Sequence, residues 1–297
     1  MPPAVSAQRP LLWVLAATAS FCCVALATRA IGNNLATTQV LFFRALIGAL
    51  VLAPIVWRLR PRLHKALFTL HLARNSLHLL GQYGWFFGLI WLPLADVTAI
   101  EFSTPLWVAL LGWACLGERP SRPTLLAIAL GLAGVLTISM ESLNQYSSAS
   151  LWLLASALGY AGAHLCTRSL ATAGHSALAI LVWMYLLQTP VTLALCLNHW
   201  QWPAAGLWLY LLPIGLCALS AHYCLTRALA LADTAKVIAF DYLRLPILGG
   251  VGLLAFNEPL TGALLAGSCC ILAGCWINMR GATPAAPLLR KPEQRAL

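Results

Sequence analysis

Long apolar stretches alternate with short polar connections over almost the whole chain, and this pattern predicts membrane-spanning helices. A helix needs about 20 apolar residues to cross the hydrocarbon core of a bilayer. Ten such stretches can be drawn, at 11–31, 36–57, 68–92, 95–116, 122–140, 150–172, 176–197, 204–230, 234–256 and 260–279. The predicted fold class is therefore an all-α integral membrane protein with ten transmembrane helices.

The second half of the pattern repeats the first at a constant offset of 140 residues. Glu118 and Glu258 are separated by this offset, and segment 95–102 (ADVTAIEF) matches segment 235–242 (AKVIAFDY). Each half would cross the membrane five times, and because five is odd the two copies must be inverted relative to each other. Inverted repeats with polar groups at their junction are the usual plan of a secondary transporter.

The repeat also predicts the domain organisation. Arg9 and the apolar stretch after it resemble a secretory signal. However, segment 26–30 aligns with segment 165–169 at an offset of 139, so we interpret this stretch as an uncleaved first helix. The predicted parts are a cytoplasmic N-terminus (1–10), a first repeat (11–140), a second repeat (150–279) and a disordered basic cytoplasmic tail (280–297).

Composition and charge support a membrane protein. Apolar residues make up 61% of the chain and charged residues 9%, with a mean hydropathy of +0.82. This leaves too little polar surface to cover a soluble globule. The net charge of +10 is concentrated on alternate connections, and the third, fifth, seventh and ninth connections carry no positive residue. This asymmetry predicts that both termini are cytoplasmic, and it explains the basic balance without a nucleic-acid partner.

Motifs of other function classes are missing from the sequence. The ten cysteines lie almost entirely in apolar stretches, without CxxC or Cys/His spacing. There is no GxSxG, HExxH, P-loop or dinucleotide fingerprint. We therefore predict no metal, no cofactor and no catalytic residues, and an ATP-driven pump would need a separate motor subunit.

Ionisable and polar side chains within apolar helices are costly and mark candidate functional positions. The third helix carries a stripe along one face, formed by His71, Arg74, His78, Gln82 and Trp85. We interpret His71 and Arg74 as snorkelling to the cytoplasmic interface. His78 and Gln82 are deeper, and Gln82 is predicted to line a cavity.

The repeats place a carboxylate at equivalent positions of the fourth and ninth helices, Glu101 and Asp241, each followed within five residues by a proline. Proline frees a backbone carbonyl, which is tolerated at membrane depth where it lines protein or water. Arg244 follows Asp241 by three residues, so the two either neutralise each other or contact a ligand.

Glu101 has no charged partner on its own helix. Arg44 or Arg74 could reach it from another helix, or it is neutral and exchanges protons with substrate or solvent. Glu101 and Asp241 are therefore the candidates for proton coupling.

Further polar residues follow the repeat. His222 and Tyr223 are the counterparts of Gln82 and Tyr83, which predicts a polar and aromatic pair at equivalent heights in the third and eighth helices. His164 in the sixth helix is interpreted as a core histidine. Glu118 and Glu258 precede the fifth and tenth helices, where a carboxylate can cap a helix.

The repeated pattern resembles the EamA family of the drug/metabolite transporter superfamily over roughly residues 11–280. The residues that carry the resemblance are Pro105-Leu106-Trp107, Leu116-Gly117-Glu118-Arg119, Asp241-Tyr242-Leu243-Arg244-Leu245-Pro246 and Asn257-Glu258-Pro259. The resemblance implies ten helices, cytoplasmic termini, a central cavity between the repeats and alternating access without ATP. It also implies an amino acid, a nucleotide-type metabolite, a vitamin or a drug as substrate. The Glu101-Phe102 and Asp241-Tyr242-Leu243-Arg244 stretches further resemble a bacterial branch that includes S-adenosylmethionine and riboflavin importers.

We therefore expect a secondary transporter in a bacterial inner membrane that moves a small polar organic metabolite and is not an enzyme. An integral membrane enzyme and an efflux exporter of the same fold are the alternatives. Direction, coupling ion, exact substrate and oligomeric state stay open. The predicted substrate-binding residues are His78, Gln82, Trp85, Glu101, His222, Tyr223, Asp241, Tyr242 and Arg244.

Overall fold

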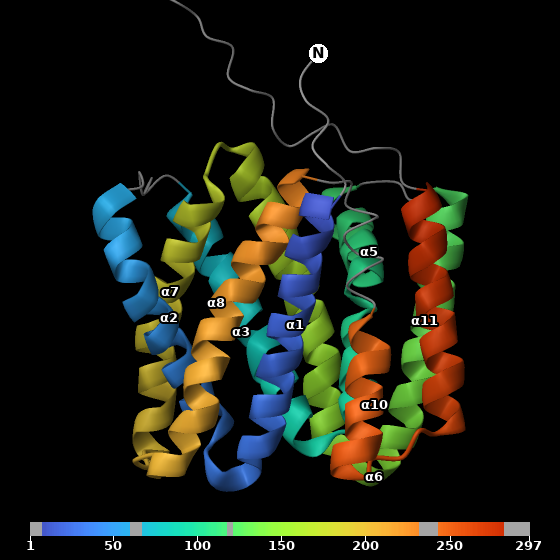
Figure 1. Cartoon of the computed structure of the whole chain (residues 1–297). Coiled ribbons are helices and arrows are strands. Elements are labelled where there is room, and N and C mark those ends of the chain that lie inside the picture. Colours follow the sequence, from blue (N-terminus) through green and yellow to red (C-terminus); the bar gives the residue numbers. More distant parts are fainter. Residues whose placement is uncertain (1–7, 60–66, 118–120, 232–242, 282–297) are drawn as a thin grey trace, which may run out of the picture.

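A computed structural model of the chain describes residues 8–59, 67–117, 121–231 and 243–281. Helices account for almost all of these residues, and no strand occurs among them. They are α1 (Gln8–Ile31), α2 (Thr37–Leu59), α3 (Phe68–Trp91), α4 (Leu94–Glu101), α5 (Thr104–Leu116), α6 (Arg122–Thr172), α7 (Ala177–Cys196), α8 (Trp208–Leu231), α10 (Arg244–Phe256) and α11 (Gly262–Gly281). Most of them run along one common direction (Figure 1). The predicted all-α class is confirmed.

Seven segments of the described helices are long and apolar enough to cross a membrane. They are 11–34, 37–58, 94–115, 122–140, 148–172, 177–199 and 205–225. The apolar helices 244–256 and 262–277 are shorter than these seven segments. α3 is not among the seven, and it carries the polar stripe described above. The multi-pass membrane character is confirmed, while the count of ten crossings stays a prediction.

Two predicted helices appear together in α6, because its helical residues continue through the connection between spans 122–140 and 148–172. The predicted fourth helix is instead divided into α4 and α5. Pro105 has no N–H to donate to the carbonyl of Glu101, and the hydroxyl of Thr104 donates to that carbonyl at 2.6 Å. The expected effect of proline is thus present, and it leaves Glu101 at a break in the helix.

Several helix packings join one helix from each half of the sequence. In these packings α1 lies against α8, α2 against α7, α4 against α10, α3 against the second span of α6, and α11 against its first span. The contact of α6 with α11 needs glycine, since a Cβ on Gly134 would lie 2.5 Å from the carbonyl oxygen of Gly267. A Cβ on Gly274 would lie 2.7 Å from the carbonyl oxygen of Ala127. The two contacts are equivalent in the repeat, because the 140-residue offset relates Gly134 to Gly274 and Ala127 to Gly267.

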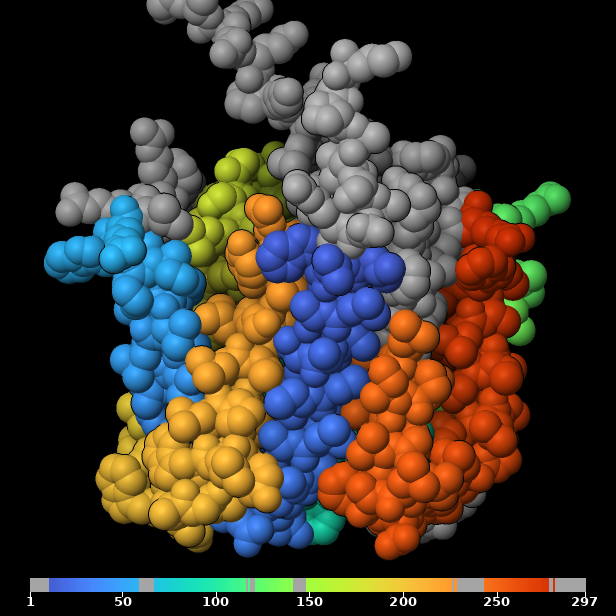
Figure 2. Space-filling model, viewed as in Figure 1, coloured from blue at the N-terminus to red at the C-terminus, as the bar shows by residue number. Residues whose placement is uncertain are grey.

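The outer surface is apolar. Figure 2 shows the side on which α2, α8, α1, α10 and α11 follow one another. Large apolar side chains project from these helices, among them Leu254 (84% exposed), Trp57 (79%) and Leu209 (72%). Such a continuous apolar exterior is suited to lipid rather than to water.

Candidate functional site

An ion pair joins the two halves of the chain near the middle of the bundle. Arg244, at the start of α10, donates from both terminal nitrogens to Glu101, with Nη1–Oε2 at 3.3 Å and Nη2–Oε1 at 3.2 Å. Trp85 of α3 donates its indole N–H to Oε2 of Glu101 at 2.9 Å. The expectation that Arg44 or Arg74 would reach Glu101 is therefore wrong in this conformation, because Arg244 takes that position.

Aromatic rings enclose the cation of this pair. The guanidinium of Arg244 lies 4.7 Å from the ring centroid of Phe21 and 5.1 Å from that of Phe102, distances at which the ring quadrupole attracts a cation. Phe21 also meets the ring of His222 edge to face, with centroids 6.0 Å apart. Phe21 thus connects the ion pair to a second polar cluster.

The second polar cluster, which we call the amide cluster, consists of Arg44, Gln82, Gln188, His78 and His222 from α2, α3, α7 and α8. With its amide oriented by its neighbours, Gln82 accepts from Nη1 and Nη2 of Arg44 at 2.7 and 2.9 Å and donates to the side-chain oxygen of Gln188 at 3.0 Å. Gln188 donates to Nδ1 of His78 at 3.1 Å. Nη2 of Arg44 lies 3.4 Å from Nε2 of His222. The structure therefore brings the predicted residues His78, Gln82 and His222 together.

The stripe of α3 continues toward the face at which α1 begins, which we call the N-terminal face (Figure 1). Arg74 donates to Oδ1 of Asn75 at 2.9 Å and to the hydroxyl of Thr167 at 3.3 Å. His71 Nε2 lies 3.1 Å from Nδ1 of His175. The predicted snorkelling of His71 and Arg74 is wrong, because both side chains are buried and make contacts within the protein.

The inner face of α6 is identified by its contacts with α3. Tyr160 meets His78 with ring centroids 5.5 Å apart, and Thr167 bonds Arg74. His164 is four residues after Tyr160 and three before Thr167, so it lies on the same helix face. It is exposed, and the interpretation as a core histidine is therefore wrong. Its side chain is therefore accessible on the side of α6 that faces α3.

Three predicted residues lie apart from these clusters or outside the described residues. Tyr223 is 51% exposed and meets Trp13 edge to face with ring centroids 5.8 Å apart. It therefore lies apart from the amide cluster that contains His222. Asp241 and Tyr242 lie outside the described residues.

A second ion pair lies near the face opposite the N-terminal face. Arg29, near the end of α1, contacts Glu258 with Nη2–Oε1 at 2.6 Å. Nη1 of Arg29 also donates to the carbonyl of Ile90 at 2.6 Å. The other carboxylate oxygen of Glu258 accepts from the backbone N–H of Leu94 at 2.7 Å. The interpretation of Glu258 as a cap of the tenth helix needs correction, because it caps α4 of the other half. Its counterpart Glu118 lies outside the described residues.

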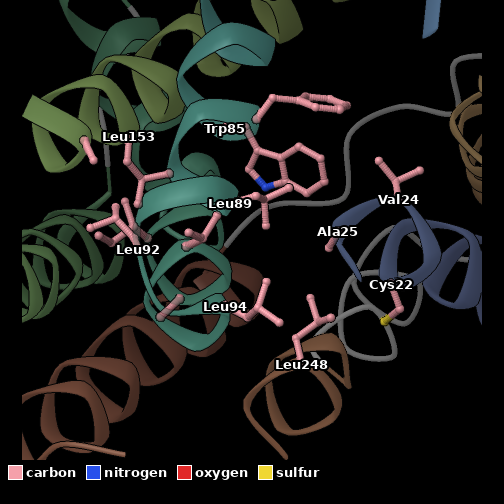
Figure 3. Packing of buried hydrophobic residues seen from close by; sticks show 14 of the residues in the cluster. Cys22, Val24, Ala25, Trp85, Leu89, Leu92, Leu94, Leu153 and Leu248 are labelled. Atoms are coloured by element: carbon pink, nitrogen blue, oxygen red, sulfur yellow. The ribbon is translucent and has the colours of Figure 1, made fainter. Parts of the chain in front are cut away.

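An apolar layer separates the two ion pairs. It is formed by Val24 and Ala25 of α1, Leu89 of α3 and Leu248 of α10, all at most 2% exposed. Figure 3 shows these side chains packed toward one another from the three helices. The layer falls between Arg244 and Glu258 in the second half, and between Phe21 and Arg29 along α1, so buried apolar side chains separate the two ion pairs.

Several residues of the site were not among the predicted binding residues. Arg29 and Arg44 each place a single charge within an apolar helix. That charge is a signal from which they could have been predicted as site residues. Gln188 is an amide in an otherwise apolar helix and gives a weaker signal. Phe21 has no signal in the sequence, since its role depends on which residues pack against it.

The described residues contain no group of three or more His, Cys, Asp or Glu side chains that could hold a metal ion. The two clusters consist of the Glu101 carboxylate, guanidinium groups, amides, imidazoles and aromatic faces. Such a set binds and orients a polar solute.

Comparisons with known proteins identify a transporter family, and a solved structure shares the fold. Residues 8–140 match the model of the EamA-like transporter family. A riboflavin transporter of Rhizobium johnstonii is 34% identical over 212 residues, which cover 71% of this chain and 70% of the relative. The pseudopaline exporter CntI of Pseudomonas aeruginosa is 28% identical over 82% of this chain and 86% of its own. A solved structure described only as "Crystal structure of protein" matches with a TM-score of 0.59 and 19% identity, covering 93% of this chain and 98% of that one.

Proposed function

Because the chain belongs to the EamA-like transporter family, we propose that this membrane transporter moves a small polar organic metabolite across a bacterial inner membrane by alternating access. The proposed architecture is ten helices in two inverted five-helix repeats with cytoplasmic termini. It is supported by the packing of α2 against its equivalent α7, and of the first span of α6 against its equivalent α11. The exchange of the Gly134 and Gly274 contacts under the 140-residue offset supports it as well.

One observation carries the proposal, namely the Glu101–Arg244 pair with the aromatic rings around it. The pair is contributed by α4 of the first half and α10 of the second, with Trp85 and Phe21 beside it. Transporters with inverted repeats bind their substrate at such a junction. We propose that Trp85 and Phe21 offer flat faces to the solute. Gln82, His222, Glu101 and Arg244 would make the directional polar contacts, with Asp241 and Tyr242 as further candidates.

The apolar layer and the Arg29–Glu258 pair supply the closed side of the proposed transport cycle. Together they block the face opposite the N-terminal face. With cytoplasmic termini, this conformation is closed toward the periplasm. His164, which is exposed on the inner face of α6, is consistent with access from the cytoplasmic side.

The proposed function includes both import and export. One relative is named a riboflavin transporter and another a pseudopaline exporter. A flavin-like, amino acid or nucleoside-like solute fits the mixture of aromatic faces and polar contacts. Glu101 and Asp241 remain the candidates for proton coupling, and an exchanger or facilitator would need neither.

Flux measurements in proteoliposomes test the proposal. Riboflavin would be loaded on one side, with and without an imposed pH gradient, and its transfer followed by fluorescence. We expect flux above protein-free vesicles that is lost in Arg244→Ala and retained in Arg280→Gln, because Arg280 lies on the exposed end of α11. Chemical conversion of riboflavin by the detergent-solubilised protein, without a compartment, would instead favour the membrane enzyme.

A further inference from the structure

Two buried arginines have no acidic partner among the described residues. Arg29 is paired with Glu258 and Arg244 with Glu101. In contrast, Arg44 and Arg74 contact amide, imidazole and hydroxyl groups rather than carboxylates, and both side chains are buried, at 3% and 6% exposure. A charge in the membrane interior is costly unless it is paired, and such charges mark substrate pathways. The polar interior thus carries two positive charges that its described carboxylates do not neutralise.

The contact geometry of Arg44 indicates what would neutralise it. Both Nη1 and Nη2 point to one acceptor, the amide oxygen of Gln82, at 2.7 and 2.9 Å. A guanidinium fork of this kind matches the oxygens of a carboxylate or a phosphate, which bind it about twice as strongly as a neutral acceptor does. Gln82 therefore occupies the position that an anionic group would take.

Arg74 has a similar neutral environment, with Oδ1 of Asn75 and the hydroxyl of Thr167 as acceptors. The backbone carbonyl of Asn75 accepts from Gln188 at 3.3 Å, and Gln188 accepts from Gln82. Hydrogen bonds therefore connect the surroundings of Arg74 to those of Arg44. From residue 74 to residue 82, α3 rises by about 12 Å, so the two cations follow each other in depth.

The order of these groups suggests a path for an anion. His164 is exposed on the face of α6 that also carries Thr167, the partner of Arg74. Arg74 is therefore near an accessible position on the inner face of α6, while Arg44 lies further along α3, beside His222. His222 meets Phe21, which covers Arg244. If the anionic end of a solute were bound to Arg44, the rest of the solute would lie close to the aromatic rings around Arg244.

Resting on the proposed function, we infer that the preferred solute carries a carboxylate or phosphate group, which passes Arg74 and binds the fork of Arg44 in place of the Gln82 oxygen. This names a substrate class, an organic anion with an aromatic or otherwise flat body. It also assigns Arg44 and Arg74 as specificity-determining residues.

Matched ligand pairs test the inference on the purified full-length protein. Riboflavin and riboflavin 5′-phosphate differ by a phosphate, and S-adenosylmethionine and its decarboxylated analogue differ by a carboxylate. Affinity is measured from the ligand-dependent rise of the thermal midpoint. We expect the anionic member of at least one pair to bind about tenfold more tightly or better, as charge-assisted hydrogen bonds provide. The pair that shows the preference distinguishes phosphate from carboxylate.

Variants assign the preference to the two arginines. Arg44→Gln and Arg74→Gln should each reduce the preference, and the double substitution should abolish it while the neutral member still binds. Gln82→Glu places a carboxylate in the fork, so it should abolish the preference without removing either arginine. This isosteric variant keeps the test valid where a glutamine at position 44 prevents folding. Arg280→Gln is the matched control and should keep the preference, since Arg280 lies over Trp276 at 4.6 Å on α11.

The inference is wrong if the wild type shows no preference for the anionic member of either pair, or if the preference survives the double substitution and Gln82→Glu. Flux of the same ligands in proteoliposomes separates this result from failure of the proposed function. Riboflavin flux without an anion preference leaves the transporter proposal intact and overturns the anion site. An arginine-dependent preference without flux of any of the four ligands supports the anion site and contradicts the proposed transport of these solutes.

Discussion

Glu258 and Arg29 form an ion pair across the two halves of the chain, with Nη2 of Arg29 at 2.6 Å from Oε1 of Glu258. The same carboxylate accepts from the N–H of Leu94, the first residue of α4. One side chain from the second half therefore satisfies both a cation and a helix N-terminus of the first half. A helix N-terminus favours negative charge, so the two contacts reinforce each other.

This relationship predicts energetic coupling between the two residues. Glu258→Gln should lower the thermal midpoint, because Arg29 loses its counter-charge. Arg29→Gln together with Glu258→Gln should cost less than the sum of the single changes, with a coupling free energy of about 1–3 kcal/mol. A double-mutant cycle on the detergent-solubilised protein measures it. Additive effects would mean that the pair does not hold the two halves together.

Trp85→Phe tests the hydrogen bond to Glu101. The ring face is kept and only the N–H donor is removed, so the fold should persist. A hydrogen bond to a charged group contributes about 1.5–3 kcal/mol, and we expect flux to fall about tenfold or more if the bond is kept during transport. Trp113→Phe on α5, where the side chain is exposed, should transport normally. Equal flux in both variants would remove Trp85 from the site.

The glycine contacts between α6 and α11 predict equal sensitivity at equivalent positions. Gly134→Ala and Gly274→Ala would each press a methyl group against backbone, and overpacking of this kind costs about 1–3 kcal/mol. Gly250→Ala has nothing within 4 Å of its added Cβ and should be neutral or slightly stabilising. Thermal midpoints of the three variants check this. A tolerant Gly134 beside a sensitive Gly274 would contradict equivalent packing of the two halves.

Proton coupling predicts a loss of pH dependence. Arg244 gives the carboxylate of Glu101 a counter-charge, and opening of the pair during the cycle would let that carboxylate exchange a proton. Glu101→Gln cannot do so, and its flux should no longer respond to an imposed pH gradient. Measurements at matched membrane potential separate this effect from a simple loss of binding. Unchanged flux and unchanged pH dependence in Glu101→Gln with Asp241→Asn would contradict coupling.

Helices and their breaks were predictable from the sequence because they depend on local patterns. Apolar length located α1, α2, α7 and α11 closely, and the proline at position 105 indicated the interruption after Glu101. The continuous α6 was not predicted, since nothing in a hydropathy pattern distinguishes a helical connection from an irregular one.

The partners of the charged residues were less predictable than their positions. Glu101 was selected, but its partner Arg244 is 143 residues away, and the sequence equally allowed Arg44 or Arg74. His71 and Arg74 were assigned to the interface because α3 begins near them, yet contacts with His175 and Thr167 bury them. Sequence spacing gives a helix face, whereas the neighbour of that face is decided by packing between distant helices.

Phe21, which contacts both Arg244 and His222, has a consequence for how this protein can diverge. A change at Arg244 or Glu101 alone leaves a buried charge without its partner, so such changes must arise in pairs. A change of the ring at position 21 leaves the Glu101–Arg244 contacts and the Phe102 ring in place. Single mutations at position 21 therefore give natural selection an accessible route to new solute preferences.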